Sequence, residues 1–357
     1  MKKILSLVIL LISISCFSQT NFDKELDRLT DSVLANTGLP GMIVSYSCGG
    51  YTWEKAKGYA NAQDKIPMKL DNMYRIGSVT KTFTITVLLQ LVDEGKLSLD
   101  DKISKFFPRI PNGDNITVRM LADMRSGYYN YSEGAAFDDS LLNRPGKVWS
   151  NQQLVDFAMQ NPPYFPPNTD FHYANTNTIL IAMIIEKLTG SLLKDEVKNR
   201  ITDKLGLKNT YMATGKEMSG DYSHGYNDNS DTLYIPLKDV TTLYDVSWAG
   251  AAGDMISNLQ EMKIYMKALG RGELYSKEMQ TQRTNWSSSH GTMQYGLGMF
   301  TPGGGFLGHN GSIPGFTNFS VYNPDKDCLL IVMFNTQSNI SPDRLAISIL
   351  KLTGNIE

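Results

Sequence analysis

The pattern of apolar and polar positions predicts helices and strands in a definite order along the chain. An apolar stripe at helical spacing runs from Phe22 to Leu34 and stops at Gly38, which predicts an opening helix. Residues 42–47 and 51–59 are strand-like and are joined by a glycine turn, so they predict a hairpin. A second helix is expected where apolar residues share one face from Val79 to Leu91.

The stretch from about residue 97 to residue 250 has a different pattern, in which prolines separate short helical segments and clear strands are few. Its longest predicted helix runs from Ile179 to Leu188 and is stopped by Gly190. The last hundred residues return to strands, at 316–322 and 328–334, joined by a turn-rich connection. Strands at both ends of the chain therefore predict one sheet with a helical insertion.

The order of these elements predicts two domains. A last helix should begin with Ser341 as its N-cap and Pro342 at its first position. Residues 22–96 and 251–357 then form one α/β (α+β) sheet domain. Residues 97–250 form a mostly helical domain inserted between its two halves.

The composition and net charge of the chain limit the kinds of binding partner that we expect. Apolar residues make up 41% of the chain and charged residues 20%, as in an ordinary globular protein. The formal net charge is -2 and no basic run is present. Nucleic acid and anionic membrane are therefore not expected as the main partner.

Residues 1–18 predict an export signal, because two lysines precede an apolar run that is too short to span a bilayer. Cleavage is expected before Gln19. The alternative is a lipoprotein anchored at Cys16, which is disfavoured because Ser13 stands where a leucine-like residue is usual. No later stretch is apolar enough to cross a membrane, so we expect an exported periplasmic or secreted protein.

A Ser-x-x-Lys pattern occurs twice, and only one copy suggests chemistry. Ser191 and Lys194 are explained by a helix cap and a surface lysine. Ser78 also precedes a helix, with Lys81 on the same helix face within reach of its hydroxyl. A serine becomes a nucleophile when a neighbour takes its proton, and Lys81 can do so if burial lowers its pKa. The Ser78 backbone N–H, at the helix start, would be free to bind an oxyanion.

A Tyr-x-Asn pattern is also duplicated, at Tyr128 to Asn130 and at Tyr173 to Asn175. A phenol can relay a proton, and an asparagine amide can hold a lysine and a substrate carbonyl. The residues alone leave both copies open, since a tyrosine packed by its ring is the commoner case.

A glycine-rich strand near the C-terminal end carries a third set of candidates. Gly311 would let a substrate backbone approach the strand edge, and Ser312 can offer a second oxyanion N–H. His309 precedes them, and on its own it is an ordinary histidine. The histidines show no metal-like spacing.

These elements resemble the serine hydrolases of the superfamily of class C β-lactamases, DD-peptidases and family VIII esterases. The matching stretches, in chain order, are MYRIGSVTKTFT, FPPNTDFHYANTNTILIAMIIEKLTG, WAGAAGDMISN, QYGLGMF and GHNGSIPGF. The resemblance implies an antiparallel, five-stranded type of sheet flanked by N- and C-terminal helices. It also implies an inserted helical domain, an active site between the two domains, and no cofactor or metal.

The resemblance also implies roles for residues. Ser78 would be the nucleophile and Lys81 its base, and Tyr173, chosen over Tyr128 because it precedes the long helix, would be the proton shuttle. Asn175 would bind the substrate amide and Lys81. The backbone N–H groups of Ser78 and Ser312 would form the oxyanion hole, next to Gly311.

His309 stands where many members of that superfamily carry the lysine of a Lys-Thr-Gly motif. A histidine is largely neutral near pH 7 unless its environment shifts it, so recognition of a substrate carboxylate should be weaker or pH-dependent. We therefore expect a D-alanyl-D-alanine carboxypeptidase or D-aminopeptidase-like enzyme acting on a peptide or small molecule. A family VIII-type esterase or weak β-lactamase is the alternative, and a non-catalytic cell-wall peptide-binding domain is the alternative of another class.

The resemblance finally bears on the two cysteines that remain after processing, Cys48 and Cys328. In that fold the first strand lies antiparallel to the last, which brings these positions together. A disulfide is expected between them, as an oxidising compartment permits.

Overall fold

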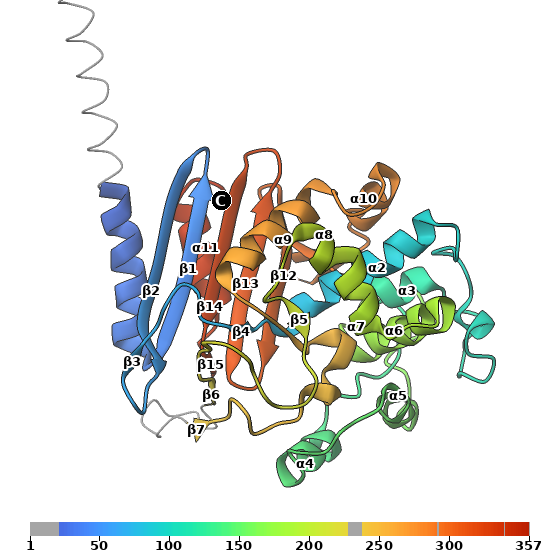
Figure 1. Ribbon diagram of the computed structural model, residues 1–357. Coiled ribbons are helices and arrows are strands. Elements are labelled where there is room, and N and C mark those ends of the chain that lie inside the picture. Colours follow the sequence, from blue (N-terminus) through green and yellow to red (C-terminus); the bar gives the residue numbers. More distant parts are fainter. Residues whose placement is uncertain (1–20, 228–237, 291–292, 339, 357) are drawn as a thin grey trace, which may run out of the picture.

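The computed structural model describes residues 21–227, 238–290, 293–338 and 340–356. Residues 1–20, with the predicted export signal and Cys16, lie outside the described residues. The main sheet has nine strands in the order β3-β2-β1-β14-β13-β12-β11-β10-β9 (Figure 1). Their bounds are β1 Gly41–Cys48, β2 Tyr51–Asn61, β3 Ile66–Pro67, β9 Ser288–His290, β10 Met293–Tyr295, β11 Phe300–Gly303, β12 Phe306–Ile313, β13 Phe316–Asn323 and β14 Cys328–Phe334.

Every neighbouring pair in this sheet is antiparallel. The five long strands are β2, β1, β14, β13 and β12, and shorter strands extend the sheet at both edges. The expected antiparallel sheet built from both ends of the chain is thus confirmed, and it is wider than five strands.

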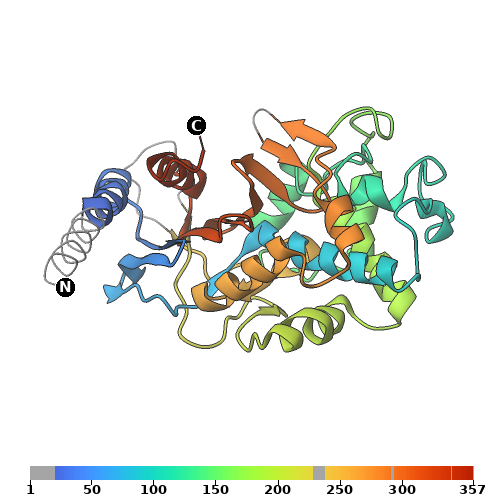
Figure 2. The same cartoon turned by 90° about the horizontal axis from the view of Figure 1, so that it is seen from above.

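The two faces of the sheet bury different helices, because successive side chains of a strand point to opposite sides. In β14, Leu330 and Val332 pack in one apolar cluster with the opening helix, residues 21–37, and with α11 (Pro342–Leu352). Leu329 and Ile331 pack in the other cluster, with α2 (Thr80–Asp93) and α9 (Leu259–Arg271). Figure 2 shows the two helix layers on either side of the sheet.

The remaining helices form a layer beside the sheet. They are α3 Val118–Ala122, α4 Ala135–Asn143, α5 Asn151–Met159, α6 Asn175–Thr189, α7 Leu193–Val197, α8 Asp203–Leu205 and α10 Lys277–Arg283. Two three-stranded sheets join distant segments, β4 (Tyr74–Arg75) with β8 (Met255–Ser257) and β5 (Tyr211–Met212), and β15 (Thr336–Gln337) with β6 (Tyr226–Asn227) and β7 (Lys238–Asp239). Short one-turn segments are η1 Gly77–Val79, η2 Ile103–Lys105, η3 Lys198–Thr202, η4 Val246–Trp248 and η5 Gly250–Ala252.

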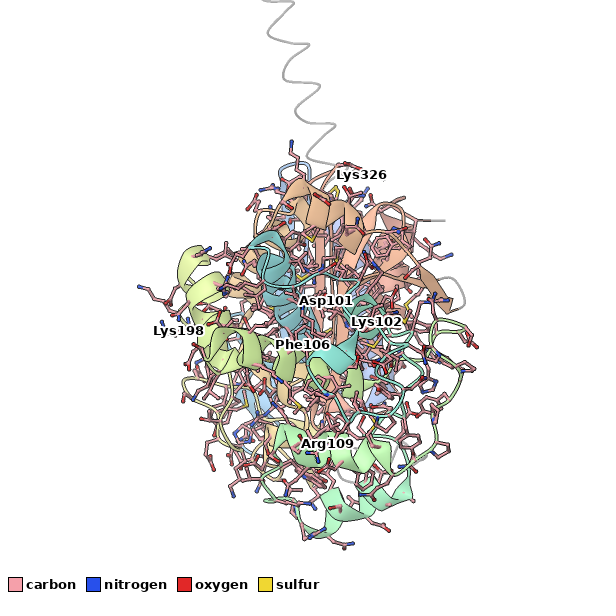
Figure 3. The ribbon with its side chains drawn as sticks, turned by 90° about the vertical axis from the view of Figure 1, so that its right-hand side faces the viewer. Asp101, Lys102, Phe106, Arg109, Lys198 and Lys326 are labelled. Atoms are coloured by element: carbon pink, nitrogen blue, oxygen red, sulfur yellow. A yellow bond between two sulfur atoms is a disulfide. The ribbon has the colours of Figure 1, made fainter. Side chains whose placement is uncertain are left out.

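The segment that follows α2 is held against this layer. Lys187 of α6 donates to the carbonyl of Phe106 at 2.7 Å. The Phe106 side chain is itself buried, whereas Lys105 pairs with Asp101 at the surface. Figure 3 views this side of the molecule and labels Asp101, Phe106 and Arg109.

Most strongly patterned elements lie where they were predicted. Helix α6 ends at Gly190, which is in the left-handed conformation with φ of 71°. Helix α11 has Ser341 as its N-cap, accepting from the Asp343 N–H, and Pro342 as its first residue. Strand β14 has the predicted bounds.

Ser191 is not a helix cap, so that prediction is wrong. The N-cap of α7 is Leu192, which provides no side-chain hydrogen bond. The free N–H of Leu193 instead donates to the Glu186 carboxylate at 3.1 Å, across the turn from the preceding helix. Glu186, from the preceding helix, thus accepts the helix N-terminal N–H that Ser191 was expected to accept.

Cys48 and Cys328 are register partners at the ends of β1 and β14, and a disulfide joins them. Their Cα atoms are 4.0 Å apart and 280 positions separate them in the sequence.

Within the described residues, no single helix combines the length and hydropathy needed to cross a membrane. The pair formed by Asn175–Thr189 and Leu193–Leu205 meets both measures together and is bent by 80° at its break.

Candidate active site

Ser78 lies in the one-turn segment η1, between the short strand β4 and helix α2. Ser78 precedes the helix, as predicted, but it is not the cap, because the N-cap of α2 is Val79 and no side chain caps that helix end. The turn begins at Gly77, whose φ of +50° suits glycine. The Ser78 hydroxyl is consequently not occupied by capping and is available for chemistry.

The backbone around Ser78 is pressed against strand β12. A Cβ added to Gly77 would lie 2.7 Å from the Ser312 nitrogen, and a Cβ on Gly311 would lie 2.1 Å from the Ile76 carbonyl oxygen. The Asn318 side chain, from β13, donates to that same carbonyl at 2.9 Å. Glycine at both positions therefore permits the close contact that brings the backbone of Ser312 beside Ser78.

The two expected oxyanion donors have suitable surroundings. The Ser78 N–H is in the first turn of a helical segment, where such groups have no partner within the helix. Ile313 and Phe316 flank the two-residue turn between β12 and β13, and bonded and non-bonded pairs alternate along an antiparallel ladder. The next pair, Ser312 and Thr317, is thus the non-bonded kind, so the Ser312 N–H points away from β13.

Lys81 is fully buried and its amine is aimed at Ser78. Its Nζ lies 3.1 Å from the Ser78 Oγ and donates to the Ala252 carbonyl at 2.7 Å. Burial holds the pKa of Lys81 well below its usual value. A neutral amine that donates one N–H to a carbonyl keeps its lone pair for the Ser78 proton, so Lys81 meets the requirements of a base.

Tyr173 lies on the other side of that amine, with its ring centroid 4.7 Å from Lys81 Nζ. Burial raises the pKa of the phenol, and the nearby Ser78 side chain opposes part of that rise. Among the described residues its buried hydroxyl has no partner of good hydrogen-bond geometry. The phenol is therefore protonated near neutrality and suited to give a proton to a leaving group.

Asn175, the first residue of α6, is held by a loop that contains the other Tyr-x-Asn copy. Its backbone N–H donates to the Asn130 side chain at 3.0 Å, and its Nδ2 donates to Ser132 at 2.8 Å. The expected hydrogen bond with Lys81 is absent from the described residues, because that amine bonds Ser78 and Ala252. The Asn175 Oδ1 is buried without a partner among the described residues. Tyr128, the rejected candidate, instead donates to the Pro111 carbonyl at 2.6 Å.

His309 occupies the middle of β12 and is 1% exposed. Its Nδ1 lies 2.5 Å from the Asn310 carbonyl, which can only accept, so Nδ1 carries the proton and Nε2 accepts from the Tyr295 hydroxyl at 3.1 Å. Burial is the main cause that lowers the pKa of His309 to about 3, and Lys81 in its protonated form is the second cause. The expected pH-dependent recognition of an anion by His309 is thus not supported, since the ring is neutral across the physiological range.

A cavity of about 620 Å³ is lined by several of these groups, whereas Lys81 and Asn175 are not part of its lining. Ser78, Tyr173, His309, Gly311 and Ser312 all line it, together with aromatic side chains such as Phe171, Tyr295 and Phe300. Within the described residues, no group of three or more His, Cys, Asp and Glu side chains is placed to hold a metal ion.

Sequence reasoning missed several contributors to the site. Tyr295 belongs to the stretch QYGLGMF, which carried the family resemblance without an assigned role. No sequence pattern around Asn318 or Ser132 pointed to a role in the site. Ala252 contributes a backbone carbonyl, which no pattern of side chains can reveal.

Comparisons with known proteins agree with this geometry. The family model described as Beta-lactamase matches residues 26–354. Penicillin-binding protein 4* of Bacillus subtilis is 26% identical over 338 residues, covering 89% of this chain and 73% of its own. A D-stereospecific amidohydrolase from a Streptomyces species has a TM-score of 0.80 at 33% identity, covering 90% of this chain and 96% of its own. The D-amino acid amidase of Ochrobactrum anthropi, solved with L-phenylalanine amide, has a TM-score of 0.82 at 26% identity, covering 94% and 99%.

The family match spans nearly the whole chain. Within it, Ser78 and the half-buried Tyr173 line one cavity, and the buried Lys81 amine lies beside both. This protein therefore belongs to the β-lactamase family and is a serine hydrolase.

Proposed function

We propose that this protein is an exported acyl-hydrolase that cleaves amides or esters of D-amino acids through a covalent intermediate on Ser78. The observation that carries the proposal is the buried Lys81 amine 3.1 Å from the Ser78 hydroxyl, with Tyr173 beside both. The similarity to a D-stereospecific amidohydrolase and a D-amino acid amidase supports the substrate class.

Acylation would begin with transfer of the Ser78 proton to the neutral Lys81 amine. The Ser78 oxygen bonds to the substrate carbonyl carbon, and the resulting oxyanion is stabilised by the N–H groups of Ser78 and Ser312. As the bond to the leaving group breaks, Tyr173 donates its proton to the leaving nitrogen or oxygen, and protonated Lys81 restores the phenol. The products of this step are the acyl-enzyme and the free amine or alcohol.

Deacylation would use the same groups in reverse. A water molecule loses a proton toward Lys81, through Tyr173, and its oxygen attacks the ester carbonyl of the acyl-enzyme. Ser78 Oγ leaves and takes up that proton, which releases the D-amino acid and regenerates the resting site. These reaction steps require no second, dedicated carboxylate base.

The cavity favours an amidase or aminopeptidase over a carboxypeptidase. Among the described residues that line it, none is lysine or arginine, so no fixed cation is present to bind a C-terminal substrate carboxylate. His309 does not supply one, since its pKa of about 3 leaves it neutral.

The direct test compares the wild-type protein with Ser78→Ala. Incubation with a fluorescent fluorophosphonate should label the wild type at Ser78, and D-phenylalanine amide should be hydrolysed faster than its L-isomer. Ser78→Ala should lose both, by a factor of roughly 10⁴ or more in kcat. Absence of labelling together with absence of turnover of D-amides and esters would refute the proposal. Export is checked separately, by sequencing the mature N-terminus, which is expected at Gln19.

A further inference from the structure

Thr84 is a fully buried threonine of helix α2 that neither the acylation nor the deacylation step uses. It lies three positions after Lys81, so the two side chains share one face of the helix. Both donate to the one-turn segment η5, at adjacent carbonyl groups. Lys81 donates to the carbonyl of Ala252 at 2.7 Å, and Thr84 donates to the carbonyl of Ala251 at 2.8 Å. Thr84 thus holds the peptide group next to the one that accepts from the amine.

The bond to η5 is the shorter of two that the Thr84 hydroxyl can donate. A threonine within a helix can also donate to the carbonyl four residues earlier, which here is that of Thr80, at 3.5 Å. The hydroxyl has a single proton, and O–H···O hydrogen bonds are usually about 2.7–2.8 Å long. The proton is therefore directed to the Ala251 carbonyl, and Thr84 links helix α2 to η5.

A second threonine of α2 holds the chain just after η5. The Thr80 hydroxyl accepts from the Met255 N–H at 3.2 Å, and the Met255 carbonyl accepts from the Ile76 N–H at 3.0 Å. Ile76 is two residues before Ser78. The segment that carries the Ala252 carbonyl is therefore attached both to the helix of Lys81 and to the turn that holds Ser78.

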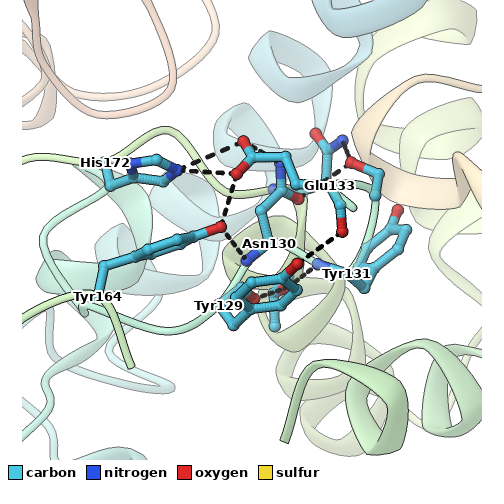
Figure 4. A network of polar contacts seen from close by, with 9 residues as sticks. Tyr129, Asn130, Tyr131, Glu133, Tyr164 and His172 are labelled. Atoms are coloured by element: carbon cyan, nitrogen blue, oxygen red, sulfur yellow. Dashed lines mark hydrogen bonds and ion pairs between the residues drawn. The ribbon is translucent and has the colours of Figure 1, made fainter. Parts of the chain in front are cut away.

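The direction of the Lys81 amine depends on few contacts. Within the described part of the chain it has hydrogen bonds to two groups, the Ser78 hydroxyl at 3.1 Å and the Ala252 carbonyl at 2.7 Å. Asn175, which was expected to bond it, is held instead by the loop that contains Asn130. Figure 4 shows this loop and its hydrogen bonds, with Asn130 labelled. The position of the Ala252 carbonyl therefore determines how the amine faces Ser78.

We propose that Thr84 is a positioning residue for the transfer of the Ser78 proton to Lys81, because it fixes the part of η5 whose carbonyl orients the amine. The proposal rests on the proposed function and deepens it. The proton passes from Ser78 Oγ to Lys81 Nζ, which accepts it through its lone pair. An N–H held by a fixed carbonyl keeps that lone pair aimed at Ser78, whereas a displaced carbonyl would let the amine turn away.

The Ala252 carbonyl also affects the protonation of Lys81. A hydrogen bond from an ammonium group to a carbonyl stabilises the charged form and so raises the pKa of the amine. Burial acts in the opposite direction and holds the pKa of Lys81 well below its usual value. If Thr84 loses its hydroxyl and the carbonyl moves away, the pKa of Lys81 falls further. The acidic limb of the pH–rate profile, along which the amine loses its proton, then moves to lower pH.

The experiment measures two rates as a function of pH in the wild type, Thr84→Val, Thr84→Ser and Thr86→Val. One rate is the labelling of Ser78 by a fluorescent fluorophosphonate, and the other is kcat/KM for D-phenylalanine p-nitroanilide. Thr84→Val should lower both by about tenfold or more above the acidic limb, and should move that limb down by about half a pH unit. Thr84→Ser keeps the hydroxyl and should stay within about threefold of the wild type, with an unshifted limb.

Thr86, on the same helix, provides the matched control. It is also fully buried, but its hydroxyl donates to the Thr82 carbonyl at 2.8 Å and accepts from Arg283 at 2.8 Å, neither of which belongs to η5. Thr86→Val should therefore lower the free energy of unfolding, measured by urea denaturation, while its pH profile remains that of the wild type.

Three results would overturn the proposal. The first is an unchanged rate in Thr84→Val, and the second is a loss of rate that leaves the acidic limb in place. The third is an equal loss and an equal shift in Thr86→Val, because the effect would then follow from lower stability alone.

A titration of the Lys81 Cε by ¹³C NMR tests the same claim without turnover, with Lys81→Ala identifying the signal. The amine should titrate at lower pH in Thr84→Val than in the wild type. If the wild type is neither labelled nor active but this titration shifts, the proposed function fails and the positioning of the amine by Thr84 stands. If the titration does not shift, the inference fails.

Discussion

The Tyr295 hydroxyl donates to Nε2 of His309 across 3.1 Å, inside a wall of the catalytic cavity. Together with the Asn310 carbonyl on Nδ1, this contact fixes which ring nitrogen of the histidine is protonated. Both rings also pack near Tyr173, with centroids 6.0 Å from it in each case. Tyr295 is therefore a positioning residue for the wall against which Tyr173, the proposed proton shuttle, lies.

Tyr295→Phe removes this donor and leaves the buried Nε2 without a partner. We expect the free energy of unfolding to fall by about 1–3 kcal/mol, the usual cost of an unsatisfied buried acceptor. Chemical denaturation measures that loss, and ¹⁵N NMR should show a changed Nε2 shift while Nδ1 stays protonated against the Asn310 carbonyl. A variant with wild-type stability and an unchanged Nε2 shift would contradict the assignment.

The low pKa of His309 makes the stability of the fold depend on pH. The ordinary pKa of 6.5 applies to the unfolded chain, whereas burial lowers the folded value to about 3. Between these values the unfolded state binds a proton that the folded state does not, so stability is retained above pH 6.5 and lost as the pH falls. The loss attributable to this residue approaches about 1.4 kcal/mol per pH unit.

His309→Gln tests this dependence, because it removes the titrating group. Urea denaturation at pH 7, 6 and 5 should show the wild type losing more stability than the variant at each step. Parallel curves for the two proteins would mean that His309 is not the group responsible.

Gly311→Ala should separate strand β12 from the turn that carries Ser78. The added Cβ would lie 2.1 Å from the Ile76 carbonyl oxygen and 2.6 Å from the Asn318 Nδ2, so the backbone has to shift. We expect kcat to fall at least about tenfold and stability to fall by about 1–3 kcal/mol, as for other overpacked sites. Gly146→Ala is the matched control, since no heavy atom lies within 4 Å of its added Cβ. Equal activity in both variants would contradict the close contact.

Reduction of the Cys48–Cys328 disulfide should destabilise the protein. The bond closes a loop across 280 positions of sequence, and loss of a native disulfide costs about 2–5 kcal/mol. Thermal unfolding of the wild type with and without reductant, beside a Cys48→Ser/Cys328→Ser variant, measures the effect. Identical midpoints in all three, with two free thiols in the unreduced protein, would exclude the bond.

Strong periodicity made much of the fold predictable. The bounds of β14 and the end of α6 at Gly190 followed from apolar runs and a glycine stop, because burial and backbone conformation act locally there. Two-residue strands such as β4 and β15 could not be predicted, because they exist through pairing with distant segments and have no period of their own.

The residues of the candidate site were likewise predictable only in part. Ser78, Lys81 and Tyr173 were identified by type and spacing, and the structure places all three in contact. The Ala252 carbonyl and the Asn318 amide lie 171 and 242 positions from their partners and were invisible to pattern reasoning. The sequence did not show that helix α2 begins after Val79, so that Ser78 is not its cap. The backbone of this turn packs closely against β12, a tertiary contact that has no local sequence pattern.

The pairing of β1 with β14 has a consequence for the order in which the chain folds. The hairpin of β1 and β2 is complete by residue 61, yet the other edge of β1 pairs only with residues 328–334. Until the last tenth of the chain has emerged, that apolar edge is an open template for other strands. A nascent chain therefore needs its C-terminal end before the sheet can close, which favours folding of the complete chain over folding during synthesis.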